Sequence, residues 1–90
     1  MRKNFITEAD IKDLIERSEI HAETTFDKVT VVSLKLPNNF IITESSACVD
    51  PNNYDFELGK KICLEKIENR LWELEGYRLA CKICEEDFIR

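Results

Sequence analysis

The 90-residue sequence is poor in the residues that interrupt regular structure, with two glycines and two prolines. This composition excludes collagen-like and low-complexity disordered chains, which need far more glycine, proline or polar residues. A chain of this length supports one hydrophobic core, so we expect a single domain over residues 1–90. Because a small domain with 43% apolar residues often completes its core in a partner subunit, we also expect a homo-oligomer, either a dimer or a tetramer.

Long apolar runs are absent as well. A membrane-spanning helix needs roughly 20 mostly apolar residues, and no segment approaches that length. The first residues, Met1 to Asn4, lead through Phe5 and Ile6 directly into polar sequence, so we expect no secretory signal peptide. The sequence therefore predicts a cytoplasmic protein that does not bind membranes and whose four cysteines are reduced.

Positive charge is in deficit, because 13 lysines and arginines face 18 aspartates and glutamates, for a net charge of −5. Binding to duplex nucleic acid draws much of its affinity from neutralised phosphates, so this balance argues against duplex DNA or RNA as a partner. A small anionic ligand needs only two or three cations at one place. Such a ligand is compatible with a negative net charge.

Motifs of known catalytic sites are missing from the sequence. It contains no nucleophile elbow, Walker loop, dinucleotide-binding glycine fingerprint or zinc-protease motif. The carboxylates Glu44, Asp50 and Asp55 lie close together in the sequence, but they lack the calcium-loop pattern and suit capping and turn positions. We therefore expect no catalytic residues, no enzyme activity and no cofactor.

One cysteine pair, Cys81 and Cys84, forms an isolated C-x-x-C motif. Zinc needs four ligands, and the others would have to come from Cys48, Cys63 or His21, none of which belongs to a second ligand motif. The motif also lacks the strand-then-helix context of a redox site. We expect packing cysteines and no metal site, with a zinc-bound regulator as an alternative.

The first helix is predicted over Thr7 to about Ser18, because Thr7 and Asp10 have the spacing of a capping box and apolar residues then follow with helical period. The segment from Ser18 to Asp27 shows no clear period, and the sequence predicts no particular element there. Its only histidine, His21, lies near acidic residues and is expected to be a surface residue or a hydrogen-bonded boundary residue, not a ligand.

An antiparallel hairpin is predicted next, with strands over Val29–Leu36 and Phe40–Thr43. Pro37, Asn38 and Asn39 fit a three-residue loop in which Asn39 takes the left-handed conformation. This loop pairs Leu36 with Phe40 and Leu34 with Ile42. The residues expected on its packed face are Val32, Leu34, Leu36, Phe40 and Ile42.

A long second helix is predicted from Asp55 to about Glu75, ending at Gly76. Gly59 lies on its apolar stripe, and we attribute this glycine to the close approach of another backbone. A short helical tail follows, with apolar residues at heptad-like spacing that suits packing on another subunit: Tyr77, Cys81, Cys84 and Phe88. The predicted fold class is α+β, with an N-terminal helix, an antiparallel β-hairpin, a long helix and a short C-terminal helical tail.

The least periodic stretch, Ser45–Asp55, is predicted to be the ligand-binding loop. It leads into the start of the long helix, where outward-pointing N–H groups and the helix dipole attract anions. Lysines there lie against the dipole preference, although they also suit solvated surface positions. The candidate ligand-binding residues are Ser45, Ser46, Asp50, Asn53, Tyr54, Lys60 and Lys61. Lys60, Lys61 and the loop amides would hold phosphate, Tyr54 would stack on a base, and the other side chains would read base or ribose edges.

The sequence resembles a family of small tailed-phage and prophage proteins known by the phage genes numbered forty-nine and sixty-six. The matching segments are Val31–Ile42, Glu44–Asp55, Gly59, Ile62–Cys63 and Leu71–Tyr77. The resemblance covers roughly residues 7–79 and leaves the tail, residues 80–90, outside. The family has glycine where this chain has Asn39, a substitution that a left-handed turn position tolerates.

The resemblance brings a functional hypothesis without residue assignments. Similar small phage proteins act as sponges that sequester cyclic oligonucleotide signals of bacterial antiphage immunity, a strategy called anti-CBASS. We therefore expect non-catalytic binding of a small cyclic nucleotide, such as a cyclic dinucleotide, in the cytoplasm of an infected bacterial host. The alternative is a protein-interaction module that inhibits or modulates a host protein through the outer face of the hairpin.

Overall fold

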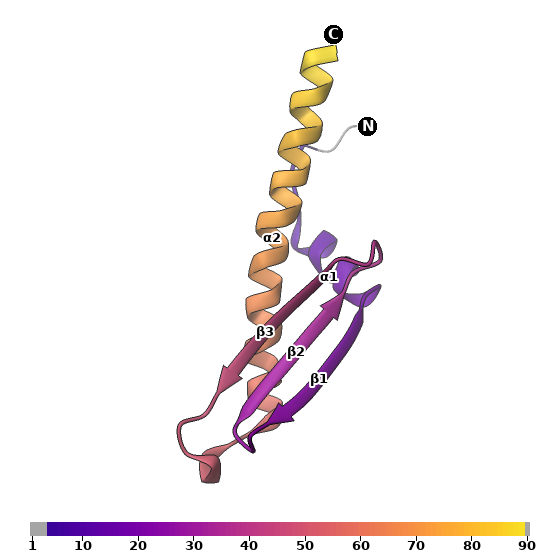
Figure 1. Ribbon diagram of the computed structural model, residues 1–90. Coiled ribbons are helices and arrows are strands. Elements are labelled where there is room, and N and C mark those ends of the chain that lie inside the picture. The colour runs from indigo at the N-terminus through magenta and orange to yellow at the C-terminus, as the bar shows by residue number, and fades with distance from the viewer. Residues whose placement is uncertain (1–3, 90) are drawn as a thin grey trace.

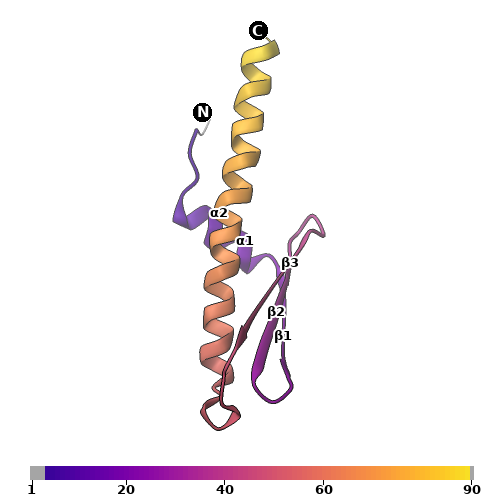
Figure 2. The same ribbon diagram turned by 60° about the vertical axis from the view of Figure 1, so that its left-hand side comes forward.

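The computed structural model describes residues 4–89, with side chains up to residue 85. The elements are α1 (Glu8–Glu16), β1 (Glu19–Thr25), β2 (Val29–Lys35), β3 (Ile41–Ala47), the 3-10 turn η1 (Pro51–Asn53) and α2 (Phe56–Ile89). The strands form an antiparallel sheet in the order β1-β2-β3, and α2 packs across one of its faces (Figures 1 and 2). This confirms the predicted α+β class.

Helix α1 begins with the predicted capping box. The Thr7 hydroxyl accepts a hydrogen bond from the Asp10 amide at 3.2 Å, and the Thr7 amide donates to the Asp10 carboxylate at 2.8 Å. These bonds satisfy two of the backbone donors near the helix start. Ile11 then points into the core, where it is fully buried.

Strand β1 was not predicted, because the segment from Ser18 to Asp27 shows no clear period in the sequence. In the structure Ile20 pairs with Leu34 and Ala22 pairs with Val32. The inward positions of β1 carry a small residue and a threonine besides Ile20, so its alternation of apolar and polar residues is weak. Pairing with the apolar strand β2 stabilises β1 as a strand, although its own sequence has only a weak strand pattern.

A tight turn joins β1 to β2, and its two central residues both have left-handed backbones. Phe26 has a φ of 54° and Asp27 a φ of 57°. Two such residues in succession give a type I′ turn, which matches the twist of hairpin strands. Phenylalanine is an unusual choice for this conformation, and the Phe26 side chain is 83% exposed.

The β2–β3 hairpin has the predicted register. Leu34 pairs with Ile42, and the Leu36 amide donates to the Phe40 carbonyl at 2.8 Å. Asn39 has the expected left-handed backbone, with a φ of 72°. Phe40 departs from the prediction, because it lies at the end of the sheet and is 48% exposed instead of packed.

Strand β3 is longer than predicted, because it continues past Thr43 to Ala47. Ser45 pairs with Val31 and Ser46 pairs with Thr30, so the two serines belong to the sheet and not to a loop. Serine has a low strand preference, and the pairing with β-branched residues of β2 outweighs it.

Helix α2 is one continuous helix of 34 residues, about 51 Å long. The predicted stop at Gly76 and the separate tail helix are therefore wrong. A glycine that ends a helix takes a left-handed backbone, and no described glycine has a positive φ. The residues on both sides of Gly76 favour helix strongly enough to continue through it.

The core lies between the sheet, α1 and the first half of α2. Its buried apolar members are Ile11, Val32, Leu34, Leu36, Ile42, Cys63, Ile67 and Leu71. Leu74, predicted to extend this stripe, is 38% exposed because the sheet does not reach it. The second half of α2 projects beyond the sheet, and the molecule measures 60 by 20 by 20 Å (Figure 1).

Gly59 explains how α2 approaches the sheet so closely. An added Cβ at this position would lie 2.8 Å from the Cβ of Thr30 on β2. The close neighbour is thus a side chain and not the backbone that the sequence suggested. Ion pairs and hydrogen bonds join the same two layers farther along: Arg70 contacts Glu44 at 3.3 Å, and the Lys66 ammonium donates to the Ser45 carbonyl at 2.8 Å.

Within residues 4–89, neither helix carries a stretch that is apolar enough to span a bilayer. Residues 1–3, which begin the segment where we expect no signal peptide, lie outside the residues that the structure describes.

Candidate functional site

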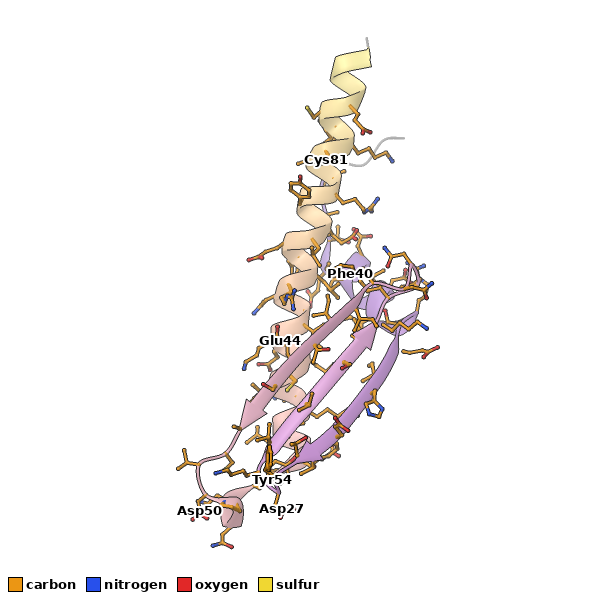
Figure 3. All side chains as sticks on the ribbon, viewed as in Figure 1. Asp27, Phe40, Glu44, Asp50, Tyr54 and Cys81 are labelled. Atoms are coloured by element: carbon orange, nitrogen blue, oxygen red, sulfur yellow. The ribbon has the colours of Figure 1, made fainter. Side chains whose placement is uncertain are left out.

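The predicted ligand loop borders a small cavity between the end of β3 and the start of α2. Its volume is about 160 Å³. Three of the predicted residues line it, namely Ser46, Asn53 and Tyr54, together with Asp55 and Cys48. The structure therefore brings part of the predicted site together at the lower end of the molecule (Figure 3).

The hydroxyl of Tyr54 is already engaged by the sheet. It lies 2.8 Å from the hydroxyl of Thr24 and 2.8 Å from that of Thr30, which is fully buried. These bonds fasten the loop to β1 and β2. Only the ring of Tyr54 is left to contact a ligand in the cavity.

The predicted residue Asp50 and its neighbour Asp55 have local structural roles. The Asp50 carboxylate accepts a hydrogen bond from the Asn52 amide at 3.0 Å and caps η1. Asp55 caps α2 in the same way, because its carboxylate accepts from the Leu58 amide at 3.2 Å. Asp50 and Ser45 are exposed and do not line the cavity. The loop is therefore ordered by its own carboxylates.

The two predicted lysines lie in the first turns of α2 but outside the cavity lining. Lys60 is half-buried and Lys61 is exposed. Successive residues of a helix point about 100° apart, so the two ammonium groups leave α2 in different directions. The cavity itself is lined by one carboxylate, that of Asp55, and by no cation.

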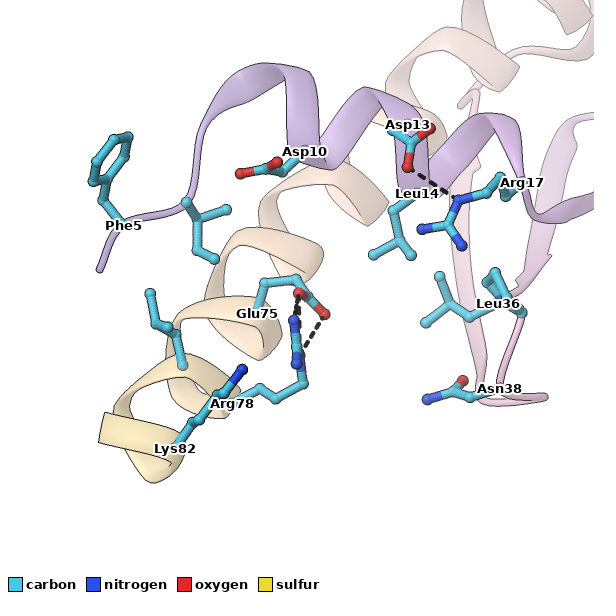
Figure 4. Close-up of a pocket in the computed structure, with 13 residues that line it drawn as sticks. Phe5, Asp10, Asp13, Leu14, Arg17, Leu36, Asn38, Glu75, Arg78 and Lys82 are labelled. Atoms are coloured by element: carbon cyan, nitrogen blue, oxygen red, sulfur yellow. Dashed lines mark hydrogen bonds and ion pairs between the residues drawn. The ribbon is translucent and has the colours of Figure 1, made fainter. Parts of the chain in front are cut away.

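A larger groove, which the sequence did not indicate, lies between α1, the hairpin tip and the second half of α2 (Figure 4). Its volume is about 670 Å³. Apolar side chains form part of its wall, including Leu14, Leu36 and Leu79, and Phe5 stands at one end. These residues come from segments far apart in the chain, so no local sequence pattern could have identified the groove.

Charged side chains of both signs line the groove. The cations are Arg17, Arg78 and Lys82, and the carboxylates are Asp10, Asp13 and Glu75. The Arg17 guanidinium contacts Asp13 at 3.0 Å, and that of Arg78 contacts Glu75 at 2.9 Å. This bond to the Glu75 carboxylate raises the pKa of Arg78 above its ordinary value. The guanidinium groups of both ion pairs are exposed.

The C-x-x-C pair lies on the projecting half of α2, where Figure 3 labels Cys81. Cys81 and Cys84 are both exposed. Cys63, by contrast, is buried in the core. Among the residues that the structure describes, no three His, Cys, Asp or Glu side chains come close enough together to hold a metal ion. His21 is exposed and lies 3.7 Å from Glu23.

A comparison with known protein families finds one whose model matches residues 6–83, described as the phage protein (N4 Gp49/phage Sf6 gene 66) family. The chain belongs to this family. The match begins just before the capping box and ends within α2, so it includes the whole sheet, the loop cavity and the groove-lining residues from Ile6 onward. It also includes Cys81, which the sequence analysis placed outside the family-like region. No curated protein and no solved structure was found to match the chain.

Proposed function

We propose that this phage protein binds and sequesters a cyclic oligonucleotide immune signal, such as a cyclic dinucleotide, without converting it. It would act in the cytoplasm of the infected bacterium and so protect the phage from host antiphage defence. The observation that carries the proposal is the groove of about 670 Å³, which three cations from α1 and α2 line together with apolar side chains. The chain's membership of a phage protein family fits this role.

Volume favours the groove over the loop cavity as the place for the ligand. Sites for small molecules typically have volumes of about 300 to 1,000 Å³. The groove, at about 670 Å³, lies inside this range, whereas the loop cavity, at about 160 Å³, lies below it. The loop residues proposed from the sequence thus form a competing site that the same experiment must test.

The groove offers the interactions that a cyclic nucleotide needs. Phosphates take paired hydrogen bonds from guanidinium groups, and Arg17 and Arg78 provide two such groups. Asp13 is exposed and Glu75 is half-buried, but both guanidinium groups are exposed, and ion pairs near the surface are weak. A doubly charged ligand can therefore displace Asp13 and Glu75, while Lys82 adds a third cation.

A base can stack at the end of the groove where Phe5 lies. Phe5 is 63% exposed, so a planar ligand in the groove can reach it. Asn38 lies at the opposite end, on the hairpin tip; its side-chain oxygen accepts from the Phe40 amide at 3.0 Å, and its amide NH₂ can donate to a base edge. The groove therefore combines phosphate, base and edge contacts in one space.

Calorimetry of the purified protein against cyclic dinucleotides and cyclic trinucleotides tests the proposal. We expect saturable binding of at least one of them. The ligand recovered after the protein is denatured should be chemically unchanged, because sequestration involves no turnover. Flat titrations across the panel, or a converted product, would overturn the proposed function.

Two matched double variants locate the site. Arg17→Ala with Lys82→Ala removes two cations from the groove, and Lys60→Ala with Lys61→Ala removes two cations from the start of α2. If the groove holds the ligand, the first pair weakens binding by about tenfold or more, since a hydrogen bond to a charged group contributes roughly 1.5 to 3 kcal/mol. The second pair should then bind as the wild type does. The reverse result would assign the ligand to the loop.

One observation favours a second function, that of a protein-interaction module. Ile41, on the face of the sheet that points away from α2, is 57% exposed. A host protein that docks on this face would be released by Ile41→Lys, while the cyclic nucleotide titrations stayed flat. Retained capture of the same partner by this variant would exclude the outer face.

A further inference from the structure

The projecting half of α2 carries an exposed strip of four residues, Leu74, Tyr77, Cys81 and Cys84, which we call the α2 strip. Tyr77 is 74% exposed, Leu74 is 38% exposed, and both cysteines are exposed. Their spacings of three, four and three residues place them on one side of the helix. The N-terminal segment faces a different side of α2, because Ile6 lines the groove together with Leu79, which is not part of the strip.

The α2 strip continues the side of α2 that packs on the sheet. Ile67, Leu74 and Cys81 follow one another at intervals of seven residues, over which a straight helix drifts by only about 20°. Ile67 is fully buried against the sheet. The same side of the helix is thus covered in its first half and uncovered in its second, because the sheet ends (Figure 1).

We infer that two copies of this chain pair antiparallel through the α2 strip, with Arg78 of one copy facing Glu85 of the partner subunit. The direction follows from the sheet. A partner helix running parallel along this side of α2 would collide with the sheet that covers its first half. An antiparallel partner meets only the uncovered half and carries its own sheet away from the contact.

Charge selects the register of this pair. When Cys81 packs against the partner's Cys84, Arg78 lies level with residue 87 of the partner subunit, within one turn of the partner's Glu85 on the same flank. The symmetry of the dimer makes this contact twice. In the neighbouring register, with Tyr77 against the partner's Cys81, Arg78 would instead approach the partner's Arg78, and the like charges would repel.

Arg78 is positioned to make this contact. Glu75 of its own chain holds one side of the guanidinium at 2.9 Å, while the side chain stays 66% exposed. Arginine carries five donors, so it can bond Glu75 and the partner's Glu85 together. Because the strip extends over only about 15 Å of helix, we expect a dimer that dissociates on dilution. This inference does not depend on the proposed ligand.

Sedimentation over a concentration series tests the dimer without any ligand. The wild type should shift from dimer to monomer on dilution. Arg78→Glu should raise the dissociation constant by about tenfold, because two ion pairs become two like-charge pairs. Arg78→Glu combined with Glu85→Arg should restore the wild-type constant. Glu65→Lys, a charge reversal at an exposed position on the same helix but away from the strip, serves as the matched control and should leave the dissociation constant unchanged.

The register is tested by the native cysteines. A short bifunctional thiol reagent should join Cys81 to the partner's Cys84, and mass spectrometry of the linked peptides identifies the pair. Predominant links between identical cysteines would contradict the antiparallel register. A protein that stays monomeric at all concentrations, or a charge swap that fails to restore the dimer, would overturn the inference.

Discussion

Gly59 on α2 lies directly against Thr30 on β2, and there is no room between them for a methyl group. A Cβ at position 59 would lie 2.8 Å from the Cβ of Thr30, which is itself fully buried. Real Cβ atoms essentially never come this close to another atom. The distance between helix and sheet at this end of the molecule is therefore set by the absence of one side chain.

Gly59→Ala is expected to destabilise the fold by about 1 to 3 kcal/mol, the usual cost of overpacking a core. Alanine favours helix over glycine by about 1 kcal/mol, so a net loss can come only from the clash with Thr30. Gly76→Ala is the matched control, because a Cβ there meets nothing within 4 Å. It should stabilise α2 by about 0.5 to 1 kcal/mol. Urea unfolding measures both, and a Gly59→Ala variant as stable as the control would refute the steric account.

Tyr54→Phe is expected to cost about 1 to 2 kcal/mol, because it removes the hydroxyl that bonds Thr24 and Thr30 and leaves the buried Thr30 hydroxyl without this partner. Tyr77→Phe removes a hydroxyl from a residue that is 74% exposed and should change the free energy of unfolding of the monomer by less than about 0.5 kcal/mol. Both variants are compared by thermal unfolding at a dilution where the protein is monomeric. Equal effects would contradict the anchoring role of Tyr54.

Cys63 should make stability fall at alkaline pH. Burial raises the pKa of its thiol above the ordinary value of 9.0, so the folded protein holds the proton more tightly than the unfolded chain does. The resulting stabilisation is complete below about pH 9 and is lost as the pH rises toward the folded-state pKa. Between about pH 8 and about pH 10, the free energy of unfolding in urea should fall less for Cys63→Ala than for the wild type. An identical pH dependence in the two proteins would rule out this contribution.

Phe26→Gly is expected to stabilise the protein by about 0.5 to 1 kcal/mol. Phe26 has a left-handed backbone, which costs a residue with a side chain roughly 1 to 2 kcal/mol. Glycine removes this cost but loses more conformational entropy on folding, which offsets part of the stabilisation. The side chain is 83% exposed, so little packing is lost. Unfolding in urea measures the gain. A destabilised variant would mean that the ring contributes more to the turn than its exposure indicates.

Features that depend on a few neighbouring residues could be predicted from the sequence. The capping box needs only Thr7 and Asp10, and the hairpin register follows from Pro37 and Asn39 together with the flanking apolar residues. Each of these signals is complete within about ten residues. That is why they agree with the structure.

Features that depend on distant segments could not be predicted. Strand β1 forms because β2 pairs with it, although the local alternation around Ala22 is weak. Gly76 resembles a helix stop, yet its backbone is not left-handed and α2 continues through it. The groove requires α1, the hairpin tip and α2 to converge. The loop residues proposed for the ligand are adjacent in the sequence, but only Ser46, Asn53 and Tyr54 of them reach the cavity.

The unbroken course of α2 through Gly76 couples the angular position of the strip to that of the core. Inserting one residue between Leu71 and Leu74 would rotate everything beyond it by about 100° relative to the sheet, and an insertion of seven residues would nearly restore the original phase. Length changes in this part of the chain should therefore alter self-association periodically while the folded sheet stays intact.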